Sequence, residues 1–321
     1  MKAQLLKILK TIVPLFIGVV LIWYSIGDLS QEQRVQLCDQ IVSTDPLFLL
    51  LSLLLALVSH ISRAYRWNFL LSPVGYQSDT KVNFAALMVG YVANLGVPRS
   101  GEFVKVGLVS KHAKIPYKPL LGTVITERLI DLVMLLLVVG LGFLLNSTLL
   151  ISFLESRHIS VSAMVMSLTF GVSLIVLSSY LLRKSDFKLF VKLRDFTADI
   201  YKGIGSVFQM KKRVSFIIHT IFIWMCYILM FYVVKFGVSG LENLSFSGVV
   251  VAFIAGSFAI STTNGGIGAY PLIVGLSLVL FDIDKIDGET YGWVIWTSQT
   301  LFNILMGVLG YIYLEVSARK R

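Results

Sequence analysis

The chain alternates long apolar runs with short polar segments. Six of the runs are long enough to cross a bilayer core of about 30 Å as a helix, which takes about 20 residues. They are Thr11–Gly27, Pro46–Phe69, Pro119–Leu145, Ile159–Leu182, Val214–Val238 and Tyr291–Leu314. The pattern predicts six full transmembrane helices.

Two further apolar segments are interrupted. Val82–Ser110 is broken at Asn94–Glu102, and Phe246–Phe281 is broken at Ser261–Pro271. Glycine and proline at this density end a helix. A bilayer core cannot hydrogen-bond exposed backbone, so such breaks must lie inside protein or line a wet cavity. Each segment therefore predicts two short helices that meet at the tip of a re-entrant hairpin.

Composition agrees with a membrane protein. Of the 321 residues, 56% are hydrophobic and only 14% are charged, and the mean hydropathy is +0.81. A soluble protein carries about 25% charged residues. The fold class is therefore an all-α polytopic membrane protein, and a soluble globule, disorder and a disulfide scaffold are excluded. Cys38 and Cys226 stand far apart without a Cys/His cluster, so we expect no metal site and no cofactor.

The net charge of +10 reflects orientation in the membrane rather than a nucleic-acid partner, because cytoplasmic loops accumulate Lys and Arg. Three lysines precede the first run, and residues 183–213 carry nine basic and three acidic residues. The segments 28–45 and 282–289 are acidic. This sorting predicts both termini in the cytoplasm and both acidic segments outside. The first hairpin then enters from the cytoplasm and the second from the outside.

The predicted order of elements is an inverted repeat. Each half reads span, hairpin, span, in opposite orientations across the membrane. We divide a single transmembrane domain, 1–321, into an N-terminal helix and outer loop (1–45), repeat half A (46–145), a linking span with a basic cytoplasmic segment (146–213) and repeat half B (214–321). Inverted repeats with interrupted helices indicate a transporter whose site lies near the bilayer midplane.

Three ionisable residues interrupt the span 119–145, namely Glu127, Arg128 and Asp131. At 1.5 Å per residue they lie about 12–18 Å into the helix. Charges at such depth indicate a functional site. The alternative is a structural ion cluster that locks this helix to the first hairpin. Both interpretations predict Arg99 and Lys105 as partners, whereas Arg63 and Arg66 are interpreted as headgroup anchors.

The hairpin tips also favour an anion. Arg99 precedes a helix N-terminus, which attracts negative charge, and its guanidinium suits phosphate. The glycines of the second break either let the backbone approach a ligand or simply form a turn with positive φ. We assign no catalytic residue. We expect a lipid phosphate or headgroup to contact Arg99, Glu102, Lys105, Glu127, Arg128, Asp131, Asn94, Asn264, Gly265, Gly266, Gly268 and Tyr270.

Several motifs carry a resemblance to a known family. They are Val97–Lys105 (VPRSGEFVK), Ile115-Pro116, Thr126–Asp131 (TERLID) and Gly265–Gly268 (GGIG). Together they resemble the lysylphosphatidylglycerol synthase transmembrane region, also called the flippase-like domain family, and the resemblance covers essentially the whole chain. Asn264 and Pro271 stand where the family usually has a proline and often a glutamate.

The resemblance implies a transporter that moves an anionic, aminoacylated or polyprenyl-phosphate-linked lipid between leaflets of the bacterial inner membrane. The sequence ends at Arg321, so we expect the flippase part without the C-terminal aminoacyltransferase domain of the full synthases. The alternatives are a membrane-embedded lipid-headgroup enzyme, with Glu127 or Asp131 as acid or base, and an accessory subunit. The expected partners are phosphate-bearing lipids, a second copy of the chain, or an associated glycosyltransferase or lipid-modifying enzyme.

Overall fold

The computed structural model describes residues 29–148, 210–263 and 265–319, together with residues 20, 23 and 27. The expected spans 11–27 and 159–182, nearly all of the basic segment 183–213, and Asn264 lie outside the described residues. All regular structure in the described ranges is helical. The described helices belong to two compact units, which divide within one helix between Glu127 and Arg128.

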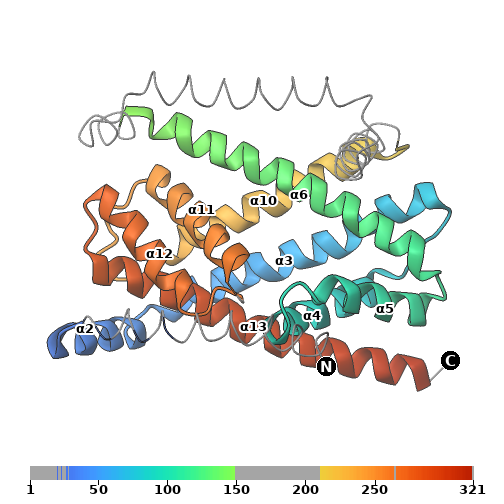
Figure 1. The fold of residues 1–321 in the computed structure, drawn as a ribbon, viewed down its shortest axis with the longest axis horizontal. Coiled ribbons are helices and arrows are strands. Elements are labelled where there is room, and N and C mark those ends of the chain that lie inside the picture. The colour runs from blue at the N-terminus through green and yellow to red at the C-terminus, as the bar shows by residue number, and fades with distance from the viewer. Residues whose placement is uncertain are drawn as a thin grey trace, which may run out of the picture. The chain divides into compact units, whose positions relative to one another are not determined.

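The larger unit covers the described residues of 1–127 and 211–321, whose helices are labelled in Figure 1. Its helices are α2 (Gln31–Val42), α3 (Pro46–Leu71), α4 (Thr80–Gly96), α5 (Gly101–Ala113), α10 (Arg213–Val234), α11 (Phe246–Thr262), α12 (Ala269–Leu278) and α13 (Lys285–Arg319). Helix α6 (Tyr117–Leu145) begins in this unit and continues into the other one.

Four of the predicted spans are confirmed as helices. The helices that are long enough and apolar enough to cross a membrane are α3 with its following turn (Pro46–Val74), α6, α10 and α13. One side of α13 exposes apolar side chains at helical spacing, including Leu301, Leu305, Val308, Ile312 and Val316. Such a stripe is costly in water and suits hydrocarbon.

Two of the polar segments expected between spans contain helical structure. The segment 28–45, expected as an outer loop, includes α2. Ser30 accepts a hydrogen bond from the backbone N–H of Gln33, and the Gln33 side chain accepts from Ser30 N, which forms a capping box. The segment 282–289 is only partly a loop, since α13 begins at Lys285 and its Glu289 is fully buried.

The first predicted break is confirmed as a turn between α4 and α5. The Asn94 side chain accepts a hydrogen bond from the backbone N–H of Gly101 at 2.7 Å. It thereby satisfies a backbone donor at the start of α5 that has no partner within the helix. Ser100 Oγ donates to the Ala93 carbonyl at 3.0 Å. The backbone of Arg99 is left-handed, with φ of 63°. The two helices then pack closely where Gly90 meets Gly101.

The second predicted break is confirmed as a turn between α11 and α12. Gly265, Gly266 and Gly268 have φ of 66°, 82° and 70°, a conformation that glycine adopts without strain. The Trp296 indole donates to the Gly265 carbonyl at 2.7 Å and holds the turn against α13. The two breaks are neighbours, because a Cβ built on Gly265 would lie 3.2 Å from Cδ2 of Leu95, near the end of α4.

Helix α13 packs against both hairpins, passing α12 first and α4 further along (Figure 1). Glycines make the approach close. A Cβ at Gly292 would lie 2.6 Å from Pro271 Cα of α12, and one at Gly310 would lie 2.9 Å from the Ala85 carbonyl of α4. Small residues of this kind let the backbones of membrane helices touch. Helix α3 pairs most extensively with α10.

Candidate functional site

Glu127 of α6 is the centre of a buried charge cluster. Its Oε1 lies 2.9 Å from Nε of Arg63 and 3.4 Å from Nη2 of Arg66. Its Oε2 lies 2.9 Å from Nζ of Lys105. Two of these cations come from α3 and the third from α5, so one carboxylate joins three helices. We call Arg63, Arg66, Lys105 and Glu127 the Glu127 cluster.

Hydroxyl groups of α10 orient the two guanidinium groups. Arg66 Nη1 donates to Thr220 Oγ1 at 2.9 Å, and Arg63 Nη1 donates to the Tyr227 hydroxyl at 3.2 Å. Arg63 and Arg66 are three residues apart, which places them on the same face of α3. That face is directed at α10, the helix with which α3 packs most.

An aromatic ring completes the cluster. The Lys105 ammonium lies 3.9 Å from the centroid of the Trp67 ring, a favourable cation–π distance. The Trp67 indole in turn donates to Thr123 Oγ1 of α6 at 3.0 Å. Trp67 is fully buried, with Lys105 over its ring and its N–H bonded to α6. Lys105 is thereby held between a carboxylate and an aromatic face.

The cluster is buried and positively charged. The side chains of Arg63, Arg66, Lys105 and Glu127 are 7%, 0%, 7% and 3% exposed. They carry three positive charges and one negative charge, a sum of +2. Taking charges out of water costs several kcal/mol per ion even after relaxation. A net positive group at this cost is typical of a functional site in a membrane protein.

The first group of predicted site residues comprises Glu127 and the charged residues expected near it. Lys105 and Glu127 were predicted as partners and are confirmed by their ion pair. The prediction that Arg99 joins them was wrong, since Arg99 is exposed and makes no ion pair within the described residues. Arg128 and Asp131 pair with each other at 3.8 Å, as their i, i+3 spacing predicted.

The remaining predicted residues lie at the two breaks. Asn94 shapes the first turn, and Glu102 is partly buried in the first turn of α5. Tyr270 is buried, with its ring against Gly256, where a Cβ would lie 2.7 Å from Cε2. The three glycines form the positive-φ turn that the sequence left as an alternative. Asn264 lies outside the described residues.

Arg63 and Arg66 are the site residues that the sequence interpretation missed. Both were taken as headgroup anchors, but both are buried and bind Glu127. A signal was present in the sequence, because both arginines already lie within the predicted span Pro46–Phe69 rather than after its end. Helix α3 continues to Leu71, so the span encloses them.

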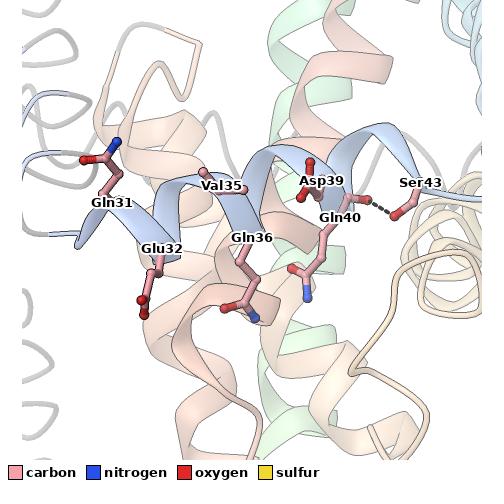
Figure 2. Close-up of a pocket in the computed structure, with 7 residues that line it drawn as sticks. All are labelled: Gln31, Glu32, Val35, Gln36, Asp39, Gln40 and Ser43. Atoms are coloured by element: carbon pink, nitrogen blue, oxygen red, sulfur yellow. Dashed lines mark hydrogen bonds between the residues drawn. The ribbon is translucent and has the colours of Figure 1, made fainter.

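A hollow lies along α2, away from the Glu127 cluster in sequence. Its volume is about 560 Å³, and Figure 2 shows that its lining side chains all come from this helix and its C-cap. They are Gln31, Glu32, Val35, Gln36, Asp39, Gln40 and Ser43. The depression is wide open, and its described lining brings no groups together from several helices. The Glu127 cluster is therefore the candidate site.

Helices that suit a membrane and a buried cluster of charged side chains are typical of a polytopic membrane protein. The profile of the lysylphosphatidylglycerol synthase TM region family matches residues 11–307. The chain belongs to this family. The UPF0104 membrane protein MJ1595 of Methanocaldococcus jannaschii is 24% identical over 129 residues, which are 39% of this chain and 38% of the relative. No solved structure matches the chain.

Proposed function

We propose that the chain is a translocase that moves a phosphate-bearing lipid between the leaflets of the cytoplasmic membrane. The lipid classes considered are anionic, aminoacylated and polyprenyl-phosphate-linked. The observation that carries the proposal is the Glu127 cluster, which gathers two guanidinium groups and an ammonium inside the helices. Guanidinium groups bind phosphate in a forked geometry, and they keep their charge when buried.

The depth of the cluster supports a path for a headgroup. Arg66 and Arg63 lie five and eight residues before the end of α3 at Leu71, which is about 8 and 12 Å along the axis. In the orientation predicted from loop charges, that position is within the cytoplasmic half of the bilayer. A headgroup that leaves the inner leaflet would meet these cations before it reached the midplane.

The two broken helices supply a means of alternating access. The α4–α5 turn and the α11–α12 turn are neighbours, in contact through Leu95 and Gly265. Interrupted helices that meet in this way surround the substrate site of many secondary transporters. The cluster is attached to the first hairpin through Lys105, so movement of that hairpin would change the surroundings of a bound phosphate.

Transport measured leaflet by leaflet tests the proposal. The purified chain is reconstituted in liposomes that contain a trace of fluorescent phosphate-bearing lipid, and the outer leaflet is quenched chemically. The wild type should expose inner-leaflet label to the quencher. Arg66→Gln should slow this at least about tenfold, because a hydrogen bond to a charged group contributes about 1.5–3 kcal/mol.

Lys111→Gln is the matched control, since Lys111 is an exposed cation on α5 outside the cluster. It should transport like the wild type. An enzyme or an accessory subunit would leave the leaflet distribution unchanged in the wild type, and that result would reject the translocase.

A further inference from the structure

We infer that His112 is a pH-sensitive clamp that, in its protonated form, fixes the end of the first hairpin to α13. The inference concerns how this hairpin is held, and it does not depend on which molecule the chain transports. It follows from the partners of the two ring nitrogens, from the position of His112 at the end of α5, and from the helix face that it shares with Lys105.

Both nitrogens of the His112 ring lie against backbone carbonyls. Nδ1 is 2.8 Å from the Leu108 carbonyl oxygen of α5, and Nε2 is 3.2 Å from the Leu314 carbonyl oxygen of α13. A carbonyl only accepts hydrogen bonds, so each nitrogen needs its own proton to bond there. A neutral imidazole has one N–H group, whereas an imidazolium has two. The arrangement is therefore complete only when His112 is protonated.

Loss of a proton would break one of these two hydrogen bonds. The deprotonated nitrogen would present a lone pair to a carbonyl oxygen, and the two acceptors would repel each other. The contact with Leu314 is the longer and therefore the weaker of the two. We expect the remaining proton to stay on the side of Leu108. The bond inside α5 then persists, while the link between α5 and α13 opens.

The end of a helix suits a positively charged side chain. His112 is buried in the last turn of α5, where unpaired carbonyl groups carry partial negative charge. Further charged residues stand on the elements that meet at this end of the hairpin. They are Lys111 and Lys114 of α5, Lys118 at the start of α6, Asp79 and Lys81 at the start of α4, and Glu315 and Arg319 of α13. All but the half-buried Glu315 are exposed, so water and salt screen their effect on the ring.

The clamp is linked to the Glu127 cluster through α5. Lys105 and His112 are seven residues apart, which places them on the same face of this helix, and both are buried. Lys105 pairs with Glu127 of α6 at 2.9 Å, and His112 reaches α13. Release at His112 would free the end of α5 from α13 while Lys105 still holds it to α6. A change of pH would thereby alter how the first hairpin is held.

Hydrogen–deuterium exchange of the full chain in phosphatidylcholine nanodiscs tests the clamp. The wild type is compared with His112→Gln, which cannot gain a charge, at pH 5.5 and at pH 8. Comparison at equal pH cancels the intrinsic pH dependence of amide exchange. At pH 5.5 the amides around Leu314 and in the last turn of α5 should exchange at least about tenfold faster in the variant, because a hydrogen bond from a charged group has about that effect. At pH 8 the two proteins should exchange alike, since histidine changes its charge between these pH values.

His219→Gln is the control for the titration of another histidine. The His219 ring bonds to the Ser62 hydroxyl at 2.7 Å, at the α3–α10 contact. This variant should keep wild-type exchange at the ends of α5 and α13 at both pH values. Equal exchange of the wild type and His112→Gln at pH 5.5 would overturn the inference. A difference between them that persists unchanged at pH 8 would also overturn it, because it would show a contact that does not respond to protonation.

The wild type alone tests the inference should His112→Gln fail to fold. The protection of the amides around Leu314, measured relative to amides in the middle of α4, should then fall between pH 5.5 and pH 8. A constant relative protection over this range would overturn the clamp.

Discussion

At the scale of residues, Glu127 determines how the cluster holds together. It is the one acid among the four side chains, and each of the three cations lies within 3.4 Å of one of its oxygens. The cations belong to α3 and α5, so repulsion between them opposes the packing of these helices. The carboxylate attracts all three cations and so offsets that repulsion. Its removal should therefore cost more than the removal of any single cation.

Glu127→Ala should lower thermal stability sharply, by about 3–5 kcal/mol, because it leaves buried cations without their shared carboxylate. Arg63→Met should cost clearly less, since Glu127 keeps Arg66 and Lys105 while the cluster sum falls to +1. Thermal unfolding of the detergent-purified chain measures both. Lys111→Ala, an exposed change on α5, should stay within about 0.5 kcal/mol of the wild type. Equal losses for Arg63→Met and Glu127→Ala would show that the carboxylate is not the centre.

At the scale of elements, the hairpins depend on close contacts between backbones. Helix α13 reaches α12 through Gly288 and Gly292 and reaches α4 through Gly307 and Gly310. In each case a Cβ would meet a neighbouring helix, and several of the nearest atoms belong to backbone. Backbone cannot rotate away as a side chain can, so these positions specify how the hairpins sit on α13.

Gly292→Ala and Gly310→Ala should each destabilise the chain by about 1–3 kcal/mol, the usual cost of overpacking. The added methyl groups would lie 2.6 Å from Pro271 Cα and 2.9 Å from the Ala85 carbonyl. Gly107→Ala of α5 is the control, because its Cβ would meet no described atom within 4 Å. That change should be neutral or stabilising through helix propensity. Similar melting temperatures for all three variants would contradict the assigned packing.

The breaks between the paired short helices could be predicted from the sequence, because glycine and proline at high density end a helix. The breaks at Asn94–Glu102 and Ser261–Pro271 are visible without any tertiary contact. The partners of Glu127 could be predicted only in part. Lys105 followed from the short chain distance to α6, but Arg63 depends on how α3 packs against α5 and α6. Arg99 was misplaced because the sequence does not reveal that it stands exposed at a turn with a left-handed backbone.

At the scale of the whole molecule, the orientation in the membrane determines which leaflet lies nearer to the Glu127 cluster, and so from which leaflet the proposed transport would begin. The positive-inside rule predicts that α2 and the start of α13 lie outside and that the end of α13 lies inside. The contacts of α2 agree with a common location for the two acidic segments. Gln40 of α2 donates to Asp287 at 2.7 Å and accepts from Thr290 at 2.8 Å. These polar contacts bring together the two segments that the charge pattern assigns to one side.

The native cysteines allow this orientation to be tested without disturbing the fold. Cys38 is exposed on α2, and Cys226 is buried in α10. A membrane-impermeant maleimide added to intact cells should therefore label the wild type at Cys38 alone. In a Cys38→Ser background, a cysteine at position 319 should label only after the cells are opened, because the end of α13 is predicted to lie in the cytoplasm. Labelling of position 319 in intact cells, or of Cys38 only after lysis, would reverse the orientation. A reversed orientation would place the Glu127 cluster in the outer half of the bilayer, so the headgroup would enter from the opposite leaflet.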